Sequence, residues 1–288
     1  MLKLFRWMSR WPLRWLHALG TALGWLAYGL SPTYRRRFAA HVEQVGIGKA
    51  AARSAVASAG RMVAELPRLW LGGAASVPWR CVGDELVRAA LDNGKGLLLL
   101  TPHLGCFEIT AQVYAINHGA EHPITVMYRP ARQAWLRDVM AGSRDRPGMT
   151  AVPAELSGVR QMMRALKRGD CVGLLPDQVP PEGMGVWAPF FGRDAYTMTL
   201  AARLAQQSGA VVLLTWGERL PDGAGYVVHY EPLPEALPAD ADAQAESAAV
   251  VNRAMQQLIL RCPGQYLWGY HRYKAPRTLA ASGSTSAN

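Results

Sequence analysis

The stretch LLLLTPHLGCFEIT, residues 97–110, joins four consecutive leucines to a Pro-His pair and then to a helical pattern. A short aliphatic run that ends at Pro102 is typical of a buried strand. If the strand ends near Thr101 and a helix begins near Gly105, His103 lies at the corner between them. The stretch therefore predicts a strand-to-helix unit with a histidine at its turn.

The same alternation of short apolar runs and helical segments continues along the chain. Such alternation favours an α/β fold, with a mostly parallel central sheet flanked by helices. A Pro-Asp-Gly turn predicts that the last two runs form a hairpin, which adds an antiparallel edge to the sheet. The further apolar runs are PITVMY at 123–128, followed by a helix from 133, CVGLLP at 171–176, AVVLLTWGE at 210–218 and GYVVHYEPL at 225–233.

We expect three parts in the chain. Residues 1–37 form a basic membrane-anchor helix, residues 38–275 form one α/β domain, and residues 276–288 form a flexible tail. Within the domain, residues 38–93 have a mainly helical pattern and residues 243–261 predict a terminal helix.

The net charge of +10 and the isoelectric point near 9.8 predict an anionic partner, which could be nucleic acid, an anionic membrane or an acidic protein. No acidic residue precedes Glu43, so positive charge is concentrated around an apolar N-terminal segment. That distribution favours a membrane over nucleic acid. The four cysteines form no CxxC pair, which argues against a zinc site or a disulfide framework and favours buried free thiols in a reducing compartment.

The anchor prediction depends on residues 15–30, an apolar helix of about 24 Å, which is short for a bilayer span. It either spans the membrane or lies in the interface, with an ordinary core helix as the alternative. Trp7, Trp11 and Trp15 recur every fourth residue and would share one helical face, as an interfacial anchor requires. A signal peptide is disfavoured because no A-x-A site follows. Gly20 and Gly24 form a GxxxG pattern that indicates helix packing.

Polar residues follow three of the expected strands. They are His103 after the first, Arg129 after the second, and the pair Asp177 and Gln178 after the third. In open α/β sheets, ligands bind at the carboxyl ends of the strands. We therefore expect these side chains to gather in one crevice.

Glu108 would lie just over one turn inside the helix that follows His103. A carboxylate there could reach back to the imidazole and make it a general base. The alternative is a capping histidine with a solvated glutamate, because H-x4-E alone is a weak motif. Zinc is disfavoured since no second histidine follows at i+4, and Cys106 is a less favoured candidate nucleophile because it would point differently from His103.

The order and spacing of HLGCFE, YRP, LLPDQVPPEGMGVWAPFFGRDAYT and QYLWGYHRYK resemble the bacterial lipid A biosynthesis acyltransferases. These are the lauroyl and myristoyl transferases of the wider H-x4-D/E glycerolipid acyltransferase superfamily. The resemblance runs from the N-terminal helix to Lys274. It implies a glycerolipid acyltransferase-like fold and an O-acyltransferase at the cytoplasmic face of the cell inner membrane.

The resemblance also implies roles for residues of this chain. His103 would take a proton from a hydroxyl of the lipid A precursor, and Glu108 would orient the histidine. The acceptor oxygen would then attack the thioester of acyl carrier protein, the acyl donor, without a metal or diffusible cofactor. Substrate binding would fall to Arg129 and Arg132, in a basic stretch suited to lipid phosphates or the acidic carrier, and to Asp177 and Gln178.

Two departures from the family pattern put the acceptor in question. Cys106 and Phe107 stand where many relatives have Asn-Trp, and Tyr270 and His271 stand where a His-Arg pair is frequent. An enzyme acting on a lysophospholipid or aminolipid therefore stays open. So does a catalytically silent, membrane-bound lipid-binding protein, although the retained His103 favours an enzyme.

Overall fold

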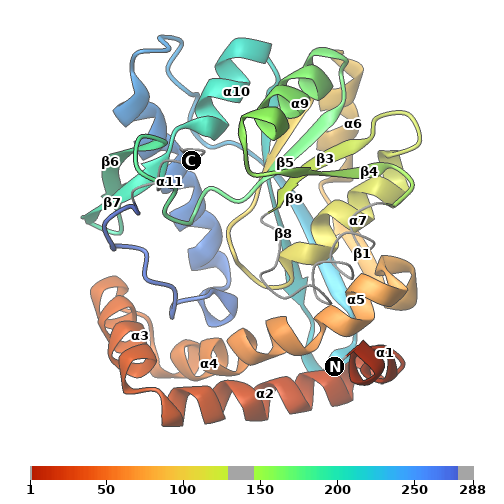
Figure 1. Ribbon diagram of the computed structural model, residues 1–288, viewed down its shortest axis with the longest axis vertical. Helices are drawn as coiled ribbons and strands as arrows, with labels where there is room; N and C mark the ends of the chain where they lie inside the picture. Colours follow the sequence, from red (N-terminus) through yellow and green to blue (C-terminus); the bar gives the residue numbers. More distant parts are fainter. Residues whose placement is uncertain (1, 129–145, 278–288) are drawn as a thin grey trace, which may run out of the picture.

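A mostly parallel sheet forms the centre of the molecule, as the alternating apolar runs predict (Figure 1). The structure is a computed structural model that describes residues 2–128 and 146–277. Within these residues the sheet has seven strands in the order β1-β9-β8-β2-β5-β3-β4. The strands are β1 (Trp79–Val82), β2 (Leu97–Leu100), β3 (Ile124–Tyr128), β4 (Met149–Pro153), β5 (Cys171–Leu174), β8 (Val211–Arg219) and β9 (Tyr226–Pro232).

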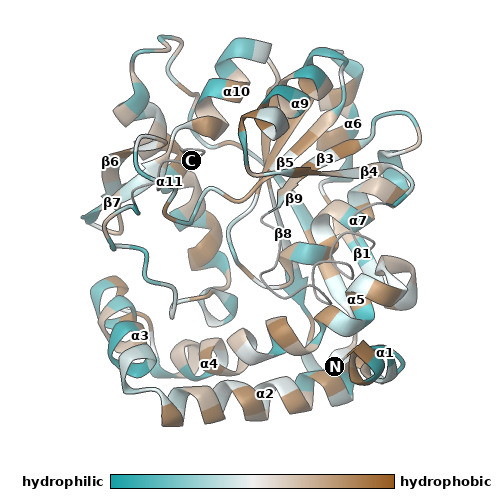
Figure 2. Cartoon of the chain, viewed as in Figure 1, coloured by the Kyte–Doolittle hydropathy of each residue, from teal (hydrophilic) through white to brown (hydrophobic). Residues whose placement is uncertain are grey.

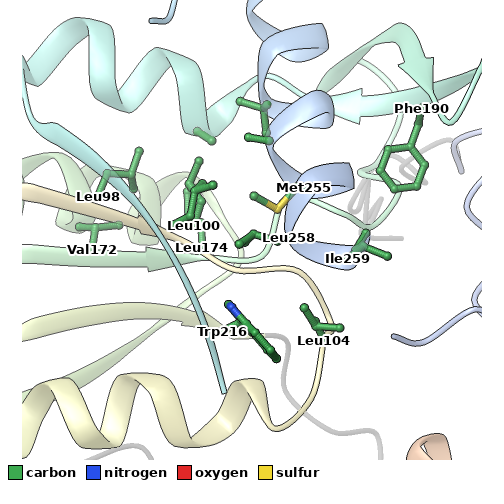
Figure 3. Close-up of a cluster of buried hydrophobic side chains, with 14 of the residues drawn as sticks. Leu98, Leu100, Leu104, Val172, Leu174, Phe190, Trp216, Met255, Leu258 and Ile259 are labelled. Carbon is green, nitrogen blue, oxygen red and sulfur yellow. The ribbon is translucent and has the colours of Figure 1, made fainter. Parts of the chain in front are cut away.

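Helices cover both faces of the sheet, which explains the run of leucines in β2. Leu98 and Leu100 pack toward α11 with residues such as Met255 (Figure 3), whereas Leu97 and Leu99 pack toward α7. A strand buried on both faces needs apolar residues at every position. The flanking helices are α6 (Asp84–Asp92), α7 (Phe107–His118), α9 (Leu156–Lys167), α10 (Leu200–Ser208) and α11 (Gln244–Arg261).

The hairpin of β8 and β9 is antiparallel, as its turn predicts, but β9 is not the edge of the sheet. β1 pairs parallel to β9 on its outer side, so these two strands run opposite to the other five of the described sheet. The sequence pattern missed β1, which is only four residues long. It also missed β4 and the separate hairpin of β6 (Gly185–Phe190) and β7 (Arg193–Met198). The expected helix from residue 133 and the tail beyond residue 277 fall outside the described residues.

Five helices precede β1 and lie along one end of the sheet (Figure 1). The GxxxG pattern of α2 packs within the chain: Gly20 and Gly24 lie against the backbone of α4 at Val56 and Gly60. A Cβ atom on Gly60 would overlap the carbonyl oxygen of Gly20, so the two helices approach as closely as backbones allow. The five helices are α1 (Leu2–Met8), α2 (Leu13–Leu30), α3 (Pro32–Val45), α4 (Lys49–Ala64) and α5 (Leu66–Gly72).

The single anchor helix expected over residues 1–37 is divided. α1 ends at Met8 and α2 begins after Pro12, so Trp7, Trp11 and Trp15 do not share one helix. The Trp11 ring nevertheless lies next to both others, with its centroid 4.6 Å from that of Trp7 and 6.2 Å from that of Trp15. No helix in the described part of the chain combines the length and apolar character needed to cross a membrane.

α2 is apolar on its outer side as well as on the side that packs against α4 (Figure 2). Trp15 and Leu26 are each 55% exposed, whereas Leu16 and His17 on the inner side are buried. Ring contacts within the N-terminal helices, such as that of Trp25 with Tyr28, leave these outer side chains largely exposed. The large apolar side chains exposed on α1 and α2 are Leu4, Trp7, Trp15, Leu23, Trp25, Leu26 and Leu30.

Candidate active site

His103 lies in the turn between β2 and α7, at the corner that the sequence predicts. The backbone of this turn is hydrogen-bonded to distant parts of the chain. The carbonyl of His103 accepts from the amide of Leu267, and the amides of Gly105 and Cys106 donate to the carbonyls of Gln265 and Gly217. Gly105 has φ +58°, and a Cβ atom there would overlap the Gly217 carbonyl, so only glycine fits this position. The imidazole is therefore carried by a fixed turn.

Asp177, in the loop after β5, binds His103 with both carboxylate oxygens. The ring Nδ1 lies 2.7 Å from Oδ1, and the backbone amide of His103 donates to Oδ2 at 2.9 Å. The Asp177 side chain is only 2% exposed. Burial alone would raise the pKa of Asp177, but the charge and hydrogen bonds of His103 hold that pKa below its ordinary value. Asp177 is thus an ionised carboxylate aimed at the imidazole.

Gln178 contacts the other ring nitrogen of His103, with its Nε2 3.0 Å from the ring Nε2. A neutral histidine that donates from Nδ1 to Asp177 has a lone pair on Nε2, and the Gln178 amide can donate to that lone pair. This arrangement fixes one tautomer. Nε2 is the nitrogen that can accept a proton.

Sheet register explains why Asp177 meets His103. Leu100 of β2 pairs with Leu174 of β5, and both residues of the pair are the last in their strands. His103 and Asp177 each follow three positions later, so they emerge side by side from adjacent parallel strands. β3 is the next strand after β5, which places the ends of all three predicted strands together. Arg129 and Arg132, the predicted binding residues after β3, lie outside the described residues.

Glu108 lies in the first turn of α7 and lines a cavity between that helix and the sheet. The cavity wall is mostly apolar and includes Leu99, Val126 and Leu174. Phe107 also lines it, and the Phe107 ring centroid is 4.8 Å from that of His103, so the cavity begins one side chain from the imidazole. In the structure Asp177 and Gln178 hold the ring nitrogens of His103. The orienting role expected of Glu108 stays a prediction.

The four cysteines are free thiols, but only Cys106 and Cys171 are buried as expected, whereas Cys81 and Cys262 are partly exposed. Cys106 is 2% exposed, and burial together with the nearby charge of Glu65 raises its pKa well above the ordinary value. A nucleophilic cysteine needs an accessible thiolate. The environment of Cys106 therefore does not suit a nucleophile, and the thiol packs as a core residue.

Two residues that the sequence did not single out support the turn. Arg219, at the end of β8, donates from Nη2 to the carbonyl of Gly105 at 3.0 Å. The Gln265 side chain bonds the backbone of Arg219 through both its oxygen and its nitrogen, at 2.9 Å each. Arg219 belongs to none of the motifs quoted above, and Gln265 opens the motif QYLWGYHRYK without an assigned role, because both contacts join segments that are distant in sequence.

Comparison with known proteins gives concordant matches. The family model described as "Bacterial lipid A biosynthesis acyltransferase" matches residues 2–275. The lipid A biosynthesis palmitoleoyltransferase of Escherichia coli K12 is 29% identical over 192 residues, 66% of this chain and 60% of that protein. The lauroyltransferase of the same strain is 29% identical over 194 residues, 67% of this chain and 61% of that protein. A lipid A biosynthesis acyltransferase of Haemophilus influenzae is 24% identical over 187 residues, 65% of this chain and 56% of that protein.

The aligned part spans about 60% of the length of the E. coli relatives. The family model, by contrast, extends over nearly all of this chain and includes the turn of His103 and the loop of Asp177. The chain belongs to the bacterial lipid A biosynthesis acyltransferase family.

Proposed function

We propose that this protein is an O-acyltransferase that moves a fatty acyl chain from acyl carrier protein to a hydroxyl of a lipid A precursor. The observation that carries the proposal is the buried carboxylate of Asp177 at 2.7 Å from Nδ1 of His103. A carboxylate partner of this kind fixes the tautomer of a histidine and stabilises its protonated form. It leaves the lone pair of Nε2 directed away from Asp177, where it can take a proton from a hydroxyl.

In the proposed reaction the acceptor hydroxyl displaces Gln178 and donates its proton to Nε2 of His103. The hydroxyl oxygen attacks the thioester carbonyl and forms the new C–O bond. The C–S bond then breaks, and the departing sulfur of the carrier takes the proton from the imidazolium. Asp177 stabilises the positive imidazolium between the first and the second proton transfer. General acid–base catalysis of this type raises the rate by about 10²–10⁴-fold.

The first methylene groups of the acyl chain would occupy the cavity beside α7, whose volume of about 60 Å³ is too small for a whole fatty acyl chain. Its apolar wall, with residues such as Leu99 and Val126, suits a hydrocarbon, and its position next to Phe107 would leave the thioester end close to His103. Glu108 lies where this cavity meets the turn and is proposed to help orient the reacting groups. Arg129 and Arg132 are proposed to bind the phosphates of the acceptor or the acidic carrier protein.

We infer that the protein works at the cytoplasmic face of the inner membrane, with α1 and α2 in the interface. The exposed apolar side chains of the outer side of α2 would enter the lipid boundary. The basic residues around them would contact anionic headgroups, as in other interfacial amphipathic helices. The basic residues flanking the apolar segment are Lys3, Arg6, Arg10, Arg14, Arg35, Arg36 and Arg37.

The proposal is tested with purified full-length protein, lauroyl acyl carrier protein and a lipid A precursor, with the products read by mass spectrometry. The wild type should add one acyl chain to the acceptor. His103→Ala should lose at least about 10²-fold in kcat. His118→Ala is the matched control, because His118 also has a carboxylate partner, Asp84 at 2.9 Å, but lies at the far end of α7.

A His103→Ala variant with wild-type turnover would refute the proposed base. Transfer by the wild type to a lysophospholipid or an aminolipid, and not to the lipid A precursor, would correct the acceptor. Lipid binding without transfer to any of these acceptors would instead identify a silent lipid-binding protein.

A further inference from the structure

A second ionic pair is fully buried behind the His103 turn. Glu65 lies between α4 and α5 and Arg219 ends β8, with side chains that are each 1% exposed. Their contact is bidentate, with Nη2 2.6 Å from Oε1 and Nε 2.9 Å from Oε2. Three further groups complete the cluster: Ser58 accepts from Arg219 at 2.7 Å, Tyr226 donates to Glu65 at 2.9 Å, and the His17 ring lies 3.1 Å from Glu65.

Arg219 extends this cluster to the turn of His103. The Nη2 that binds Glu65 also donates to the carbonyl of Gly105 at 3.0 Å. The amide of Gly105 donates to the carbonyl of Gln265, whose side chain is bonded to the Arg219 backbone. Both polar groups of the Gly105 backbone, two residues from His103, are therefore held by Arg219 or by a residue bound to it.

The energetics of buried ion pairs indicate that this pair fixes the position of the His103 turn more than it stabilises the fold. Removing two charges from water costs about as much as their attraction returns, so apolar residues of similar size often replace such pairs without loss of stability. An apolar pair, however, cannot donate to a carbonyl. The planar guanidinium fork binds both carboxylate oxygens and the Gly105 carbonyl at the same time, a geometry that a lysine ammonium on a flexible stem does not fix.

We propose that Glu65 and Arg219 are positioning residues that hold the His103 turn in its reactive conformation by fixing the carbonyl of Gly105. The inference rests on the proposed function, because it concerns the reactivity of His103. Glu65 keeps the guanidinium charged and oriented, and Arg219 anchors the turn. The same pair contacts His17 on the inner side of α2 and so joins the N-terminal helices to the turn.

The decisive variant replaces both partners with apolar residues, Glu65→Leu with Arg219→Met, in the full-length protein. We expect the double variant to fold with a melting temperature below that of the wild type, because Ser58, Tyr226 and His17 lose their partners. We also expect a kcat lowered at least about tenfold with little change in KM, and faster amide exchange in residues 101–107. The matched control is Glu235→Leu with Arg253→Met, an exposed pair with the same bidentate geometry at 2.6 and 2.9 Å. It should leave all three measurements unchanged.

A double variant that melts, turns over and exchanges like the wild type would overturn the proposal. If the double variant does not fold, Arg219→Lys decides, because lysine retains the charge but lacks the planar fork that fixes Glu65 and the Gly105 carbonyl together. It should speed exchange at residues 101–107 and lower kcat, and wild-type values for both would again overturn the inference. If the wild-type protein transfers no acyl chain, the proposed function fails, while amide exchange still tests the inference.

Discussion

The substitution Asp177→Asn tests which of two carboxylates, Asp177 or Glu108, orients the ring of His103. Asparagine has the same shape, so the loop after β5 can keep its course, but only one of its two terminal atoms is a hydrogen-bond acceptor. Both oxygens of Asp177 are used: Oδ2 accepts from the His103 amide at 2.9 Å and Oδ1 faces Nδ1 at 2.7 Å. With the remaining oxygen on the backbone amide, the asparagine NH₂ group would face Nδ1.

That NH₂ group can only donate, so Nδ1 would have to accept and the ring proton would move to Nε2. Nε2 would then have no lone pair for the acceptor hydroxyl. The same substitution of aspartate by asparagine in serine protease triads lowers kcat by about 10⁴-fold for this reason. For Asp177→Asn we expect a loss of about 10²–10⁴-fold in kcat, or roughly 3–5 kcal/mol of transition-state stabilisation, with little change in KM.

Glu108→Gln is the comparison, because the spacing H-x4-E predicts that Glu108 orients the ring. Since Asp177 holds Nδ1, the Glu108 variant should lose less than the Asp177 variant. Both are assayed as initial rates of acyl transfer by mass spectrometry, with thermal melting to confirm folding. Wild-type kcat in folded Asp177→Asn, together with a large loss in Glu108→Gln, would refute the assignment of the partner to Asp177.

Three further predictions test the framework around the site. The pKa of Glu65 is about 2 against an ordinary 4.5: burial opposes this drop, but the charge and hydrogen bonds of Arg219 outweigh it. At about 1.4 kcal/mol per pKa unit, the ionised Glu65 should contribute about 3 kcal/mol to the free energy of unfolding. This contribution should be complete above pH 4.5 and disappear as the pH falls toward 2. Denaturant titrations that show no such loss of stability would contradict the prediction. Gly60→Val should lower the free energy of unfolding in urea by about 1–3 kcal/mol, whereas Gly29→Val, in a helix position with open space, should not; equal effects would argue against tight packing of α2 on α4. Trp25→Ser, at a side chain 41% exposed on α2, should weaken sedimentation with anionic vesicles and leave kcat in detergent unchanged; unaltered vesicle binding would argue against insertion of this face.

Local features of the fold were predictable because local sequence encodes them. The four leucines of β2, the His103 turn and the helix after it follow from one continuous stretch, residues 97–118. Gly20 and Gly24 also indicated close helix packing, although their partner, Gly60, could not be named from the pattern alone. The N-terminal helix was expected to be continuous, but the chain turns between α1 and α2 at Pro12, which cannot donate the hydrogen bond of a helix interior.

The carboxylate that contacts His103 in the structure was not predictable from spacing. Glu108 is five residues from His103 in sequence, whereas Asp177 is 74 residues away, so a local argument favours Glu108. Choosing Asp177 requires both the adjacency of β2 and β5 and their register, and neither is encoded in either strand alone. β1 and the hairpin of β6 and β7 were missed for a related reason. Their short strands are stabilised by their partners more than by their own composition.

The imidazole of His103 is held by parts of the chain that meet only in the folded domain. Asp177 binds the ring from the loop after β5, Leu267 binds the His103 carbonyl from the segment after α11, and Arg219 binds the next glycine from the end of β8. A histidine turn with one local carboxylate could form in many proteins, which is why H-x4-E is a weak motif. The additional constraints distinguish a base of fixed tautomer and direction from a solvated side chain. Because each constraint comes from a different segment of the chain, loosening any one of them should reduce the reactivity of His103 before it unfolds the protein.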